Sequence, residues 1–90
     1  MDSLMDAVKQ RLARAEARHP RFAEGTWHAL GILSEEHGEA VREATKHAPG
    51  WEARMDSELI DLIVVALRML RRDHIHPEAA ELEPREVHHG

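Results

Sequence analysis

Residues 57–70 read SELIDLIVVALRML, the most apolar segment of the chain. On a helix, these apolar side chains would cover most of the circumference, and a helix that is apolar nearly all round is buried on several sides. Glu58 and Asp61 lie at the edge of this apolar surface, where a carboxylate needs a charged or metallic partner. The segment therefore predicts a buried helix that carries two acids.

Proline and glycine divide the chain into three predicted helices and a tail, so we expect an all-α fold. The helices cover residues 3–18, 26–47 and 56–73, with a preceding turn at 51–54. His19-Pro20 ends the first helix because the residue before a proline avoids the α region. Ala48-Pro49-Gly50 ends the second helix. The predicted N-caps are Ser3, Thr26, and either Asp56 or Ser57.

The length predicts one domain, residues 1–76, followed by a tail at 77–90 with at most a short helical turn. A chain of 90 residues has a thin core, and this one has no cysteine to form a disulfide. A single copy has too few helices to cover the apolar third helix. We therefore expect a homodimer or homotetramer in which the hairpin of the second and third helices forms a four-helix-bundle-like core.

Composition argues against several classes of protein. The formal charge of −5 disfavours a nucleic-acid binder, although four arginines fall early in the chain. The longest apolar run, residues 62–67, is too short to span a bilayer, so no membrane partner is expected. The first residues are acidic and do not resemble a signal peptide, and the absence of cysteine fits a reducing compartment. These features predict a cytoplasmic protein.

Two acid pairs provide the main functional signal. Glu36 and Glu39 lie three residues apart, as do Glu58 and Asp61, and residues at this spacing share one face of a helix. If the two helices face each other, four carboxylates converge, and their mutual repulsion raises their pKa values. A hard cation that prefers oxygen ligands removes this conflict. We therefore expect a site for Mg²⁺, with Mn²⁺ as a substitute, and a phosphate-bearing substrate.

A simpler interpretation is that the acids of the second helix form an ordinary solvated surface with Arg42 and Lys46. The main apolar stripe of that helix is predicted at Leu30, Leu33, His37, Val41 and Ala44, with His37 buried. A second stripe containing Glu36 and Glu39 flanks it. The position of Glu58 and Asp61 inside the most apolar segment favours the metal site.

The two acid motifs also resemble a known family. Glu35-Glu36-His37-Gly38-Glu39, followed after 18 residues by Glu58-Leu59-Ile60-Asp61, is similar to the signature of MazG-like, all-α nucleotide pyrophosphohydrolases. The resemblance implies a dimer or tetramer that uses Mg²⁺ to cleave a nucleoside triphosphate into the monophosphate and pyrophosphate. It implies metal ligation by Glu36, Glu39, Glu58 and Asp61. Glu35 would bind a further metal or orient the attacking water.

Other features of the resemblance leave alternatives open. Phosphoribosyl-ATP pyrophosphatase belongs to the same superfamily and has similar acids. Family members often have Asn at the position of Arg68, so selectivity for base and sugar does not carry over. The candidate substrate-binding residues are Lys46, Arg54, Arg68 and Trp27; each also has a structural explanation as an ion pair, an exposed surface residue or an apolar contact. The alternative from another class is a non-catalytic, metal-binding helical module for oligomerisation or regulation.

Overall fold

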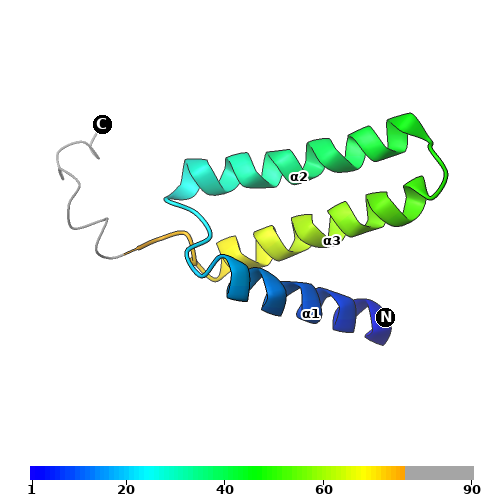
Figure 1. Cartoon of the computed structure of the whole chain (residues 1–90). Coiled ribbons are helices and arrows are strands. Elements are labelled where there is room, and N and C mark those ends of the chain that lie inside the picture. The colour runs from blue at the N-terminus through cyan, green and yellow to red at the C-terminus, as the bar shows by residue number, and fades with distance from the viewer. Residues whose placement is uncertain (77–90) are drawn as a thin grey trace.

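Three α-helices make up the part of the chain that the computed structural model describes, residues 1–76 (Figure 1). They are α1 (Asp2–Arg18), α2 (Thr26–Lys46) and α3 (Trp51–Leu70), and residues 1–76 contain no strand. The all-α prediction is confirmed. α2 and α3 form an antiparallel hairpin, and α1 packs on α3 and runs in the same direction as it (Figure 1). The tail predicted at residues 77–90 lies outside the described residues.

The connection between α2 and α3 turns through two residues with positive φ. His47 ends α2 in the left-handed conformation at φ 51°, and Gly50 precedes α3 at φ 82°. Arg54 stabilises this turn, because it donates hydrogen bonds to the Pro49 carbonyl at 2.9 Å and to the Glu43 carboxylate at 2.8 Å. A Cβ atom at Gly50 would lie 3.1 Å from the Arg54 guanidinium, so both the conformation and the space favour glycine.

α3 begins at Trp51, five residues before its predicted start at residue 56, and the preceding turn predicted at 51–54 is continuous with the helix. Trp51 donates its backbone N–H to the Ala48 carbonyl at 2.9 Å, and its ring lies 4.4 Å from the His47 ring. These contacts stabilise the extra turn. None of the three helices has a side-chain hydrogen bond at its N-cap position, which is Met1, Gly25 or Gly50. The prediction of N-caps at Ser3, at Thr26 and at Asp56 or Ser57 is therefore wrong.

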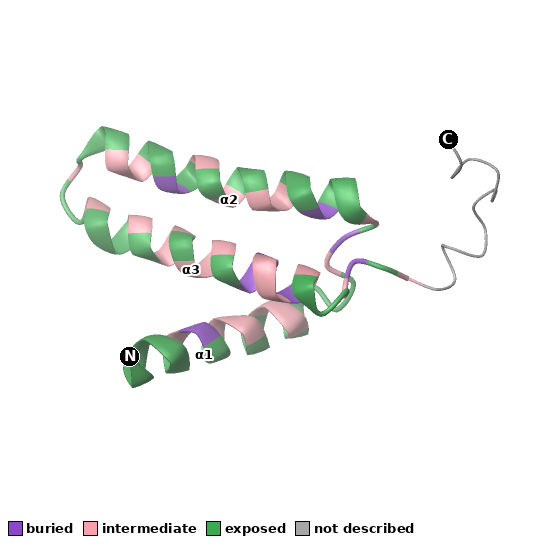
Figure 2. Ribbon diagram, turned by 180° about the vertical axis from the view of Figure 1, so that it is seen from behind, coloured by how far each residue is buried: buried purple, intermediate pink, exposed green. Residues whose placement is uncertain are grey.

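The face that α2 turns inward differs from the predicted apolar stripe. Its buried residues are Ala29 and Ala40, and Glu36 between them is half-buried. His37 and Val41 are exposed, so the prediction of a buried His37 is wrong. The buried positions of α2 lie on the side of the helix that faces α3 (Figure 2), and small side chains such as those of Ala29 and Ala40 suit a helix–helix contact. Glu36 consequently lies on the side of α2 that faces α3.

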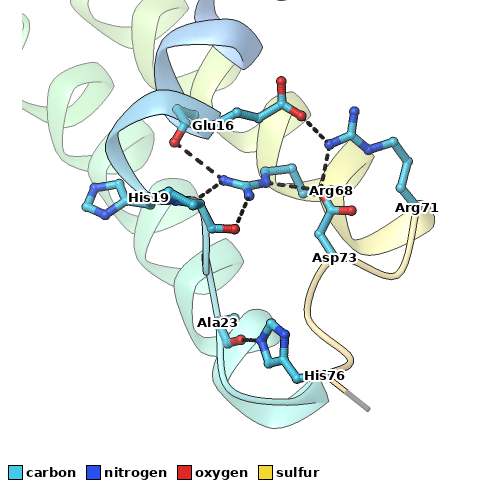
Figure 3. Close-up of polar contacts among 9 residues, drawn as sticks. Glu16, His19, Ala23, Arg68, Arg71, Asp73 and His76 are labelled. Carbon is cyan, nitrogen blue, oxygen red and sulfur yellow. Dashed lines mark hydrogen bonds and ion pairs between the residues drawn. The ribbon is translucent and has the colours of Figure 1, made fainter. Parts of the chain in front are cut away.

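Arg68 fixes the end of α1 to the end of α3 (Figure 3). Only 4% of it is exposed. Its guanidinium donates to the carbonyls of His19 at 2.8 Å and Pro20 at 3.1 Å, and it pairs with Asp73 at 3.2 Å. The last carbonyls of a helix have no intrahelical partner, and a cation is favoured there. This cluster sets the position of α1 relative to the hairpin.

None of the helices in residues 1–76 combines the length and the apolarity that crossing a membrane requires.

Candidate functional site

Three carboxylates from two helices converge between α2 and α3. Glu36 comes from α2, and Glu58 and Asp61 come from successive turns of α3. Each offers one oxygen, and these three oxygens lie within 4.8 Å of one another. The antiparallel hairpin is what places residue 36 opposite residues 58 and 61. The sequence predicted this convergence for four acids, and the structure brings together three of them.

Glu39, the fourth predicted ligand, lies outside this group. It is exposed and forms an ion pair with Arg42 at 3.1 Å. Its charge still acts on the site, because it contributes to raising the pKa values of Glu36 and Glu58. Glu35 is exposed beside Glu36 and has the same effect on its pKa.

The three acids repel one another in a partly desolvated place. Burial, followed by repulsion from Asp61 and Glu58, raises the pKa of Glu36 to about 7. Burial and then the charge of Asp61 also raise the pKa of Glu58, although Arg11 opposes this. The raised pKa values mean that the site disfavours the ionised carboxylates as long as no positive charge balances them. A divalent cation with oxygen ligands would supply that charge, so the donor set fits Mg²⁺ or Mn²⁺.

Arg11 provides the nearest positive charge. Its guanidinium pairs with the Asp61 carboxylate at 2.5 Å and donates to the backbone carbonyl and the hydroxyl of Ser57, each at 3.2 Å. These contacts join α1 to α3 directly at the acid cluster. The arginines are visible as an early cluster in the sequence, but their spacing does not predict contact with Asp61.

A cavity of about 600 Å³ opens beside the acids. α3 lines it through Asp61, Val64, Val65 and Arg68, and α2 lines it through Ile32 and Glu36. α1 and the segment after it complete the lining with Arg11, Arg14, Ala15, Arg18, His19 and Phe22. Pockets for small ligands commonly have volumes of this order. The spacing of Arg11, Arg14 and Arg18 places them on one helical face, and this was the available signal in the sequence.

Three of the four predicted substrate-binding residues do not line this cavity. Lys46 is exposed in the last turn of α2, and Trp27 is 85% exposed in the first turn. Arg54 stabilises the α2–α3 turn through the Glu43 carboxylate and two backbone carbonyls. The hydrogen bond from Arg54 lowers the pKa of Glu43.

Arg68 lines the cavity, but the expectation that its side chain is exposed is wrong. The side chain is buried, and its nitrogens bind the carbonyls of His19 and Pro20 and the carboxylate of Asp73. The Phe22 ring lies 4.9 Å from the guanidinium carbon, which adds a cation–π contact. Arg68 is therefore a structural cation that shapes the cavity wall.

Comparison of the chain with protein-family models, with curated proteins and with solved structures gives no match.

Proposed function

We propose that the protein is a metal-dependent nucleotide pyrophosphohydrolase that cleaves a nucleoside triphosphate to the monophosphate and pyrophosphate. The observation that carries this proposal is the convergence of Glu36, Glu58 and Asp61 at a cavity that Glu36 and Asp61 line together with three arginines of α1. Carboxylates that hold a cation next to a basic wall suit a ligand that is itself a metal–phosphate complex. The resemblance of residues 35–39 and 58–61 to the MazG-like signature supports the same reaction.

Glu36, Glu58 and Asp61 would hold the cation. The raised pKa values of Glu36 and Glu58 support this assignment, because a bound cation favours the ionised carboxylates that the metal-free site disfavours. When bound, Mg²⁺ would supply a water of lowered pKa and charge neutralisation for the phosphate oxygens. Glu39 stays a proposed further ligand, since its exposed pairing with Arg42 is weak enough to exchange.

The chain's own contribution to the reaction is positioning and charge. Glu35 lies next to the acid cluster and is proposed to orient the attacking water. The arginines of α1 face the space where phosphate oxygens would lie and balance their charge. Val64, Val65 and Ile32 give the cavity an apolar part that limits water around the reacting group.

A panel of nucleoside and deoxynucleoside triphosphates tests the proposal. We expect release of pyrophosphate with Mg²⁺, no release with a chelator, and loss of turnover in Glu58→Gln. A matched control is Glu52→Gln, which removes an exposed acid from the first turn of α3. Metal binding without turnover of any nucleotide would instead support the non-catalytic metal-binding module.

The exposed apolar residues of the hairpin support a homo-oligomer as part of this proposal. Leu59 and Ile63 are each 39% exposed on α3, and Leu70 is 73% exposed. An apolar surface of this kind on a small helical protein is typical of a subunit interface. Sedimentation at micromolar concentration is expected to give a dimer or a tetramer, and a stable monomer would contradict this assignment.

A further inference from the structure

The basic wall of the cavity contains arginines in two different states. Arg11, Arg14 and Arg18 all line the cavity from one face of α1. Arg11 is paired with Asp61. Arg14 and Arg18 are exposed, and neither forms an ion pair with any residue of the described segment 1–76. Two positive charges therefore face the cavity without a protein partner.

The fourth arginine of the cavity shows why these two are the ones available to a ligand. Arg68 is buried, and its three guanidinium nitrogens are engaged with backbone carbonyls and Asp73. Because Arg68 binds the carbonyls of His19 and Pro20, it fixes the C-terminal end of α1, where Arg18 lies. Arg14 and Arg18 are thus held at the cavity by the fold and not by ion pairs of their own.

The two sides of the cavity have opposite charge. Glu36 and Asp61 lie on the α2–α3 side, and Arg14 and Arg18 lie on the α1 side. A ligand that matches both sides must bring positive charge to the acids and several negative oxygens to the arginines. A divalent cation complexed by a polyphosphate has this arrangement. Arginine suits the anionic part, because its planar guanidinium forms paired hydrogen bonds with phosphate oxygens.

We propose that Arg14 and Arg18 form the polyphosphate-binding side of the site and hold the phosphates that leave as pyrophosphate. This inference rests on the proposed function, because it takes the acid cluster to be the metal side. It assigns the orientation of the substrate: the phosphate chain runs from the acids toward α1, and the nucleoside lies away from α1.

Titration calorimetry of the full chain with inorganic tripolyphosphate in the presence of Mg²⁺ tests the proposal. Arg14→Gln and Arg18→Gln are each expected to weaken binding by about tenfold, as a charge-assisted hydrogen bond is lost. Lys9→Gln is the matched control, since it removes one positive charge from the same helix at an exposed position outside the cavity. The control is expected to change the affinity by less than about twofold. Circular dichroism checks that each variant keeps its helices.

Equal weakening in all three variants would show a general charge effect and would overturn the proposal. Failure of the parent protein to bind tripolyphosphate at millimolar concentration would overturn it as well, as would tighter binding of a single-stranded oligonucleotide through the same arginines. The assay requires no turnover, so it separates the two ideas. Arginine-dependent binding without hydrolysis would keep Arg14 and Arg18 as the polyphosphate-binding side and would reject the proposed reaction. Hydrolysis that is unchanged in Arg14→Gln and Arg18→Gln would keep the proposed reaction and reject the role of these two arginines.

Discussion

Arg11 and Asp61 form an ion pair that crosses from α1 to α3, with 2.5 Å between the guanidinium and the carboxylate. In the metal-free protein this pair partly neutralises the acid cluster. A cation that binds Asp61 has to compete with Arg11 for the same oxygen. The pair therefore connects the position of α1 to the state of the proposed metal site.

Removing this competitor should strengthen metal binding. In Arg11→Gln, Asp61 is free and a nearby positive charge is gone, so we expect the affinity for Mn²⁺ to rise by about three- to tenfold. Calorimetric titration of the metal measures the change, with Lys9→Gln as the control. An affinity that stays the same or falls would show that Arg11 does not compete for the site.

The acid cluster should make stability depend on pH in a defined direction. Because the pKa of Glu36 is raised to about 7 in the folded protein, its ionised form carries a penalty. That penalty is absent below the ordinary pKa of 4.5, grows between 4.5 and about 7, and is complete above that range. Glu36→Gln without metal should thus be more stable than the parent by about 1 kcal/mol at about pH 8, after discounting for solvent screening, and nearly equal at about pH 4.

Urea unfolding in a chelator at the two pH values measures this difference, and Glu52→Gln is the control because that acid lies outside the cluster. A stability gain in Glu36→Gln of the same size at both pH values would contradict the assigned cause.

The buried position of Arg68 changes what its replacement is expected to do. Arg68→Met would leave the His19 and Pro20 carbonyls without their donor and Asp73 without one of its two arginines. We expect a loss of about 3 kcal/mol or more in the free energy of unfolding, as for other broken buried ion pairs. Guanidinium unfolding measures it, with the exposed Arg72→Gln expected within about 0.5 kcal/mol of the parent. Equal stabilities would show that the Arg68 contacts are dispensable.

Replacement of two glycines by alanine should change the stability of the protein in opposite directions. Gly50 has φ 82° and faces Arg54 at 3.1 Å, so Gly50→Ala should destabilise the protein by about 1 kcal/mol or more. Gly31 lies inside α2 with no atom within 4 Å of an added Cβ, so Gly31→Ala should stabilise it by about 0.5–1 kcal/mol. Thermal unfolding of both variants gives the comparison. Destabilisation by Gly31→Ala would show that something packs against that position.

The sequence predicted the three helices, because His19-Pro20 and Ala48-Pro49-Gly50 are strong local signals. It placed the start of the third helix at residue 56 with a preceding turn at 51–54. That turn is continuous with α3, because Gly50 and the His47–Trp51 contact support a start at Trp51. The prediction of which face of α2 turns inward was wrong. Ala29 and Ala40, which are the buried residues of α2, give only a weak apolar signal in the sequence. The acid spacing predicted a group of four acids, of which Glu36, Glu58 and Asp61 converge and Glu39 does not.

Arg68 and Arg11 could not be placed in the same way. Arg68 binds the backbone carbonyls of His19 and Pro20, which are 49 and 48 residues away in the sequence. No local sequence pattern predicts partners at that separation. Arg11 meets Asp61 across 50 residues for a similar reason. Both contacts depend on how α1 packs on α3.

Product analysis by ³¹P NMR tests whether the Glu36–Glu58–Asp61 site cleaves between the α and β phosphates. With Mg²⁺ and a nucleoside triphosphate, we expect a nucleoside monophosphate and pyrophosphate in equal amounts, and neither product in Glu58→Gln. Reaction in ¹⁸O-labelled water adds the position of attack, with the label expected in the monophosphate. Release of orthophosphate and a nucleoside diphosphate, or no turnover while the metal still binds, would contradict the proposed function.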